Sequence, residues 1–209
     1  MTARSSVKRR GGPRAATDRP LRGAPADTRA RLVSAAAVAF NRDGYHGTDS
    51  NRIAHAAGYA AGTFYKHFSD KREIFLAAWE AWVDREWEAV SKEMAATDDL
   101  DVVAERIVRL TLEHHTRWRG LRASMLALAA TDAVVRRFHR AQRRRQLRTL
   151  AGLRADRGSR PRPAEQDVLL LFTLERACDS IAQGELTALG LSRDETLRAL
   201  RNTVRLHLG

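Results

Sequence analysis

Residues 57–71 read AGYAAGTFYKHFSDK, and this stretch decides the fold. Ala54 lies just before it, Gly58 follows Ala54 by four residues, and Phe64 follows Ala54 by ten. A small residue lets two helices cross closely, a glycine takes the left-handed conformation of a tight turn, and a large apolar residue anchors the second helix. The spacing predicts a helix-turn-helix, although an alanine-rich helical hairpin would show a similar pattern.

Helix signals extend in both directions from this stretch. Strand signals are nearly absent, and residues 158–163, with two prolines, read as a loop. We expect helices over residues 28–43, 50–57, 61–67, 71–96, 101–117, 121–130, 132–155, 164–188 and 193–207. The predicted fold class is therefore all-α, with about nine helices.

The net charge of +12 is concentrated in two segments of the 209-residue chain. Residues 1–26 hold seven basic side chains against one acidic one and three of the five prolines, which predicts a flexible basic arm. Residues 136–148 hold seven arginines and no acid. This run is typical of the solvated face of a helix, and a second site for nucleic acid or an acidic ligand is the alternative.

The stretch at 57–71 closely resembles the N-terminal signature of the TetR family of helix-turn-helix regulators, and the detailed match covers about residues 28–76. The resemblance implies a helix-turn-helix DNA-binding domain at 27–72 and a ligand-binding and dimerisation domain at 73–209. It also implies contacts with the DNA backbone from Thr48, Tyr65, His67 and Lys71. Contacts with bases are implied around Ser50, Ala61, Thr63 and Lys66.

The residues themselves agree with a DNA-binding role. Gly62 has no side chain, so the start of its helix can approach a phosphate or base edge closely. Hydrogen-bond donors at 63–67 suit phosphate contacts and some base contacts. Ala60 and Ala61 depart from the family pattern, which has longer polar residues there. Fewer direct base contacts are therefore expected, and DNA shape should contribute more to recognition.

Catalytic and cofactor signatures are missing from the sequence. It contains no phosphate-binding glycine loop and no nucleophile elbow, so we expect no enzymatic activity and no cofactor. His114 and His115 are adjacent, which points them about 100° apart on a helix and suits a shared metal poorly. Cys178 is the single cysteine, and no apolar run reaches the length of a membrane span. We expect a bacterial cytoplasmic, nucleoid-associated protein that makes no contact with a membrane.

The resemblance further implies an effector pocket and a dimer interface in the larger domain. Candidate pocket residues are Trp79, Trp82, Trp118, Met125, Phe138, Phe172 and Glu175, which predicts a largely apolar or aromatic effector. Core packing is the alternative for each aromatic residue, and pairing with an arginine is the alternative for Glu175. Leu197, Leu200 and Val204 have the spacing of an apolar stripe on the last helix and are the candidate dimer residues.

Together these observations predict a homodimeric, ligand-responsive transcriptional regulator. Its expected partners are double-stranded operator DNA and a small-molecule effector that releases it, as in a repressor. The alternative is a sequence-independent DNA-compacting protein that binds through the basic arm and the arginine run. Salt dependence and the ratio of specific to random DNA binding discriminate between the two.

Overall fold

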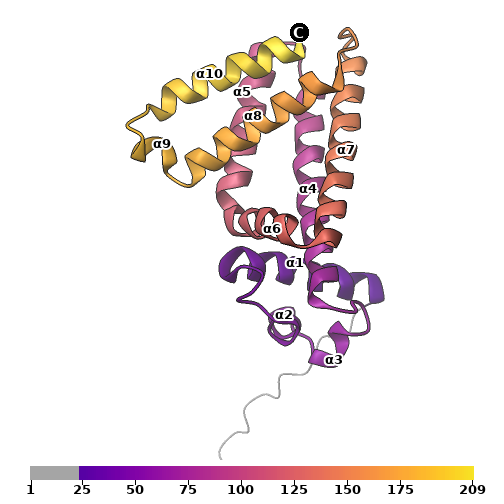
Figure 1. Ribbon diagram of the computed structural model, residues 1–209. Helices are drawn as coiled ribbons and strands as arrows, with labels where there is room; N and C mark the ends of the chain where they lie inside the picture. Colours follow the sequence, from indigo (N-terminus) through magenta and orange to yellow (C-terminus); the bar gives the residue numbers. More distant parts are fainter. Residues whose placement is uncertain (1–23) are drawn as a thin grey trace, which may run out of the picture.

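The computed structural model describes residues 24–209, and this part of the chain is built from helices with no strand (Figure 1). The predicted arm at 1–26 lies outside the described residues except for its last three positions, of which Pro25 begins the first helix. The helices are α1 (Pro25–Asp43), α2 (Ser50–Ala56), α3 (Ala61–Phe64), α4 (Lys71–Ala95), α5 (Leu100–Arg117), α6 (Arg119–Thr131), α7 (Ala133–Asp156), α8 (Ala164–Ala182), α9 (Glu185–Ala188) and α10 (Arg193–Leu208).

Short polar side chains set the starts of five helices. Each accepts hydrogen bonds from backbone N–H groups of the first turn, which have no partner inside the helix. The capping residues are Asp49, Asp70, Asp99, Asp132 and Ser192.

The predicted helix at 164–188 is interrupted in the structure. Gly184 has a φ of 75°, a left-handed conformation that a right-handed helix cannot include, so α8 ends before it and the short α9 follows. Residues 24–209 therefore form ten helices rather than about nine. The third helix is also shorter than predicted, because its α-helical part ends at Phe64 and turns cover 65–67.

The helix-turn-helix has the predicted anchors. Gly58 takes a φ of 80° in the turn between α2 and α3, and the Tyr59 N–H donates to the Ala54 carbonyl at 2.9 Å. Ile53, Ala54 and Phe64 are completely buried. The glycine therefore makes the turn while the small and large apolar residues hold the two helices together.

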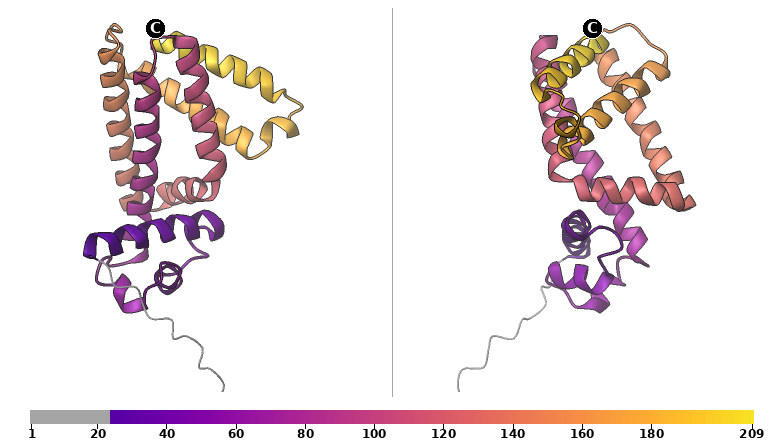
Figure 2. Two further views of the ribbon diagram at one scale, coloured as in Figure 1. Left: turned by 180° about the vertical axis from the view of Figure 1, so that it is seen from behind. Right: turned by 60° about the vertical axis from the view of Figure 1, so that its left-hand side comes forward.

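The first three helices gather at one end of the molecule (Figures 1 and 2). α4 runs from this end along the rest of the molecule, and α6 lies crosswise between α1 and the other long helices. One apolar cluster joins α1–α4 to α6 and α7, with Phe40, Phe75 and Met125 among its members. A second cluster joins α4 and α5 to α7, α8 and α10. The predicted domain boundary between 72 and 73 stays a prediction, since the first cluster continues across it.

Within residues 24–209, no helix combines the length and the apolar character needed to cross a bilayer.

Candidate DNA-binding surface and effector cavity

The exposed surface of α3 and the turn after it carries most of the predicted DNA contacts. Ala61, Gly62, Tyr65 and Lys66 are exposed, and Thr63 is half-buried beside them. A Cβ added at Gly62 would meet nothing within 4 Å, so the backbone there is open to an approaching molecule. His67 is half-buried at the end of the same turn, and Ser50 is half-buried at the start of α2.

The buried side chains of Phe64 and Phe68 form the apolar support on which this surface packs. Both side chains are buried, as expected from the sequence, and their ring centroids are 5.7 Å apart. Tyr65 packs edge-on against Phe64 but remains 60% exposed, which leaves its hydroxyl accessible. The donors of α3 therefore stand on an apolar base that fixes their direction.

The side chains of Thr48 and Lys71 form hydrogen bonds with backbone carbonyls of the same chain. The Thr48 side chain is buried, and its hydroxyl donates to the Gly44 carbonyl at 3.1 Å. Lys71 Nζ donates to the carbonyls of Tyr45 and Thr48, both at 2.9 Å, and lies 4.4 Å from the centroid of the Tyr45 ring. Their first role is to fix the loop between α1 and α2, and the DNA contacts implied for them stay predictions.

A small cavity lies among α4, α5, α7, α8 and α10. Its volume is about 50 Å³, and most of its wall is aliphatic. The lining residues are Glu86, Trp87, Val90, Met94, Ile107, Thr111, Leu150, Leu170, Leu171, Leu174, Glu175, Val204 and Leu208. Glu175 alone among the seven predicted pocket residues lines this cavity.

The other six predicted pocket residues lie elsewhere. Trp79, Trp82 and Met125 are buried in the first apolar cluster, while Trp118 and Phe138 are partly buried against it. Phe172 on α8 is 52% exposed, and the guanidinium of Arg143 on α7 lies 5.4 Å from the centroid of its ring. Helical spacing identified these side chains as apolar but could not tell which face of each helix meets the cavity. Trp87 was missed, although it continues the stripe formed by Val83, Val90 and Met94.

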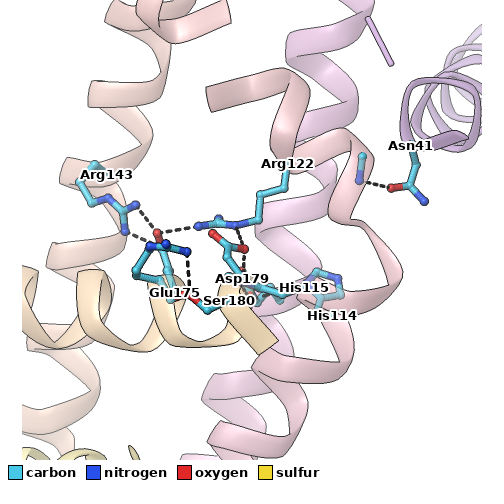
Figure 3. Close-up of polar contacts among 11 residues, drawn as sticks. Asn41, His114, His115, Arg122, Arg143, Glu175, Asp179 and Ser180 are labelled. Atoms are coloured by element: carbon cyan, nitrogen blue, oxygen red, sulfur yellow. Dashed lines mark hydrogen bonds and ion pairs between the residues drawn. The ribbon is translucent and has the colours of Figure 1, made fainter. Parts of the chain in front are cut away.

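Buried ionic side chains connect α5, α6, α7 and α8 beside the cavity (Figure 3). Arg122 donates to Asp179 at 2.7 Å and to Glu175 at 3.1 Å, and Arg143 donates to both oxygens of Glu175 at 2.6 Å and 2.7 Å. His115 Nδ1 lies 3.0 Å from Asp179. Glu175 thus pairs with arginines, as one interpretation of the sequence expected, and it also lines the cavity, while its role as a polar anchor for a ligand stays a prediction.

The partners of the buried acids in this cluster keep them ionised. Burial alone would raise the pKa of Asp179, but hydrogen bonds from His115 and Arg122 outweigh it and lower the pKa to about 2. Burial likewise opposes the ionised form of Glu175, and the guanidinium groups of Arg143 and Arg122 lower its pKa. Within residues 24–209, no grouping of His, Cys, Asp and Glu could hold a metal ion.

The predicted dimer residues on α10 belong to the core of the same chain. Leu200 is 4% exposed, Val204 is 1% exposed, and Leu197 packs partly buried against the same cluster. They face α5 and α8 because α10 folds back onto both helices. Exposed apolar side chains that the sequence reading passed over are Leu169, Leu189, Leu191 and Leu206, and Phe172 joins them.

The arginine run of α7 divides into paired and exposed members. Arg136 donates to backbone carbonyls at the end of α6, Arg143 pairs with Glu175, and Arg145 pairs with Asp84. The exposed members are Arg137, Arg140, Arg144 and Arg148. The run therefore contains a solvated face, as the sequence predicted, together with three arginines that hold helices in place.

These features define the chain as a helix-turn-helix protein with a larger helical part that encloses a cavity. Residues 32–78 match the family described as "Bacterial regulatory proteins, tetR family". The N-terminal domain of the chain is therefore of the tetR family type.

Relatives support this assignment over different lengths of the chain. The HTH-type transcriptional repressor AcnR of Corynebacterium glutamicum is 28% identical over 190 residues, which cover 87% of this chain and 94% of AcnR. The HTH-type transcriptional activator FasR of Mycolicibacterium smegmatis is 34% identical over 73 residues, or 35% of this chain, and the match spans only 33% of FasR. The structure of the transcriptional regulator FadR from Bacillus subtilis in complex with stearoyl-CoA has the same fold, with a TM-score of 0.63 and 17% identity over 86% of this chain and 96% of FadR.

Proposed function

We propose that the protein is a ligand-responsive transcriptional regulator that binds operator DNA as a homodimer. The observation that carries this proposal is the exposed surface of α3, where Gly62 leaves the backbone open and Thr63, Tyr65 and Lys66 present donors beside it. Such a surface fits a major groove, with phosphate contacts around it. On this proposal the protein acts on the bacterial chromosome.

A second copy of the chain is the proposed partner of the exposed apolar face on α8. Leu169 is 63% exposed and Phe172 is 52% exposed, one helical turn apart, and Leu206 on α10 is 59% exposed. Exposed apolar side chains that lie together on one helix face, as Leu169 and Phe172 do, are a feature of interaction sites. A two-fold axis there would present two α3 helices to half-sites about 34–36 Å apart.

The cavity is the proposed effector site, and the complex of FadR with stearoyl-CoA shows that this fold can hold a small molecule. An effector acts only through a difference in affinity between two arrangements of the protein. α6 provides a physical connection, since Arg122 ties it to α8 and Asn41 of α1 accepts hydrogen bonds from its first N–H groups. We propose repression relieved by the effector. The relatives include both a repressor and an activator, so the direction of control is part of what must be tested.

DNA titration with the ligand-free protein tests this function. DNA from the region upstream of the protein's own gene, and random DNA of the same length, are titrated by fluorescence anisotropy at several salt concentrations. A regulator should prefer its operator by about a thousandfold or more, whereas a DNA-compacting protein should bind both alike. Lys66→Ala should weaken operator binding, and Lys92→Ala, which removes the same charge from an exposed site on α4, should not. Equal affinity for operator and random DNA would refute the proposal.

A further inference from the structure

The polar part of the cavity wall has a single sign of charge. Its polar side chains are Glu86, Thr111 and Glu175, and no cationic side chain lines it. The remaining wall is made by aliphatic side chains, Met94 and Trp87. A molecule inside would therefore meet carboxylate oxygens and one hydroxyl as its polar contacts.

Glu86 is buried and ionised but lacks a strong hydrogen bond. Its side chain is 10% exposed, and its Oε1 lies 3.6 Å from His114 Nδ1 and 3.5 Å from His115 Nε2. These distances are too long for strong hydrogen bonds, and both ring nitrogens are buried without a partner in the described part of the chain. Burial opposes the charged form, yet the two imidazoles outweigh it and lower the pKa of Glu86 to about 2.

Glu175 provides a contrast within the same wall. Its two oxygens accept hydrogen bonds from Arg143 at 2.6 Å and 2.7 Å, and Arg122 adds a third at 3.1 Å. A carboxylate that is already bonded in this way gains little from a new donor. Glu86, which only the two imidazoles approach, at 3.5 Å and 3.6 Å, therefore keeps more capacity to accept a further hydrogen bond than Glu175 does.

We infer that the cavity binds an apolar molecule with a protonated amine, and that Glu86 receives the ammonium group. The inference deepens the proposed function, since it names the chemical class of the effector. The apolar part of the ligand would lie against Val90, Leu170 and Leu174. A volume of about 50 Å³ favours a short chain, or a longer one that moves the helices apart.

The geometry favours a cation over an anion. An anionic head group would need donors, and among the lining side chains only Thr111 and Trp87 carry one, since His114 and His115 do not line the cavity. It would also bring its charge against two ionised carboxylates. An ammonium group instead meets a carboxylate that its imidazole neighbours approach only to 3.5 Å and 3.6 Å, and a charge-assisted hydrogen bond is about twice as strong as a neutral one.

Calorimetry with three probes of equal chain length tests the inference on the full-length protein. The probes are hexylammonium, 1-hexanol and hexanoate, which have six carbons each and carry a cationic, a neutral and an anionic head group. Hexylammonium should bind at least about tenfold more tightly than either of the others. Equal or tighter binding of hexanol or hexanoate, or no binding of hexylammonium at millimolar concentration, would overturn the inference.

Two matched variants locate the head group. Glu86→Gln keeps the shape of the side chain and should abolish the preference for hexylammonium, whereas Glu88→Gln removes a charge from an exposed site on the same helix and should keep it. A preference that survives in a folded Glu86→Gln protein would refute the role of Glu86. If that variant does not fold, two measurements on the wild-type protein still test the inference. These are the probe series and the quenching of Trp87 fluorescence, with Trp87→Phe as reference.

The two proposals can fail separately. Operator titration of the ligand-free protein tests the regulator and involves no cavity ligand. The head-group series tests the cavity and involves no DNA. A protein that binds its operator but prefers hexanoate would keep the proposed function and lose this inference.

Discussion

Asn41 in α1 caps the start of α6 at Gly120, where the two helices are in direct backbone contact. Asn41 Oδ1 accepts hydrogen bonds from the N–H groups of Gly120 at 3.0 Å and Leu121 at 3.2 Å. Figure 3 shows Asn41 and one of these contacts. Its Nδ2 donates to the Arg117 carbonyl at the end of α5. The Asn41 side chain thus supplies hydrogen-bond partners to backbone groups at the end of α5 and at the start of α6. These bonds attach α1 to both helices.

Gly120→Ala should destabilise the protein through this contact. A Cβ at Gly120 would lie 2.0 Å from the backbone oxygen of Asn41, a position that no rotamer change can relieve. We expect a loss of about 1–3 kcal/mol, typical of overpacking, and a fall of several degrees in Tm. Thermal unfolding followed by circular dichroism measures it.

Gly152→Ala is the matched control for this substitution. Gly152 is exposed within α7, and a Cβ there would meet nothing within 4 Å. Alanine is the better helix former by up to about 1 kcal/mol, so stability should stay equal or rise. A Gly120→Ala protein as stable as the Gly152→Ala protein would show that α1 and α6 can separate without cost.

Lys66 and Lys71 should separate DNA binding from loop stability. Lys66→Ala should weaken operator binding and lower the salt slope by about one unit without changing Tm, because its side chain is exposed. Lys71→Ala should lower Tm as well, because the carbonyls of Tyr45 and Thr48 lose their shared donor. Anisotropy titrations and thermal unfolding of both variants provide the test. Equal effects of the two substitutions on Tm would contradict the structural role of Lys71.

Leu169→Glu combined with Phe172→Glu should produce a folded monomer. Both side chains are exposed on α8, so charges there are tolerated by the chain itself but not by an apolar interface with a second copy. Leu200→Glu should instead unfold the protein, since Leu200 is 4% exposed in the core. Sedimentation at micromolar concentration, with circular dichroism as the check on folding, measures both. A monomeric wild type, or a dimeric double variant, would rule out this interface.

The sequence predicted local structure better than it predicted which helix faces of residues 73–209 meet the core, the cavity or solvent. The helix-turn-helix follows from short-range rules, because Ala54, Gly58 and Phe64 need only their own spacing to define the turn. Leu200 shows the limit of such rules. Its apolar stripe was visible in the sequence, but whether that stripe meets α5 of the same chain or another copy depends on how the helices pack.

Contacts between residues far apart in the sequence explain what the sequence could not predict. Nothing local to Glu86 shows that two histidines of α5 lie beside it, nor that Trp87 rather than Trp79 lines the cavity. Gly184 is an exception, because a glycine inside the helix predicted over 164–188 is a local signal for a break in that helix. The polar cluster could not be predicted from the sequence, because its members come from five separate helices, α4, α5, α6, α7 and α8.

The charge of the polar cluster around His115 gives the last prediction, which concerns pH. The groups that face His115 are Glu86 on α4, Asp179 on α8, Arg122 on α6 and its neighbour His114. Burial would lower the pKa of His115, but the hydrogen bond to Asp179 and the carboxylate of Glu86 outweigh it and raise the pKa. The cluster has three carboxylates, Glu86, Glu175 and Asp179, against the two guanidiniums of Arg122 and Arg143. A proton on His115 therefore balances its charge.

An ammonium group bound at Glu86 would take over the balancing role of that proton. The added positive charge lowers the pKa of His115 in the complex, so binding releases a proton wherever the free protein holds His115 charged. Affinity for hexylammonium should therefore rise with pH between about pH 6 and pH 8, by at most about tenfold per unit. The probe itself stays charged over this range, as a lysine amine does.

Calorimetry in buffers with different ionisation enthalpies measures the number of protons released. His115→Gln should remove the pH dependence, and His55→Gln, at an exposed site on α2, should keep it. The wild-type data suffice if the buried variant does not fold. Affinity that falls with rising pH, or binding without proton release at every pH tested, would show that His115 keeps its proton and that the cation does not bind beside Glu86.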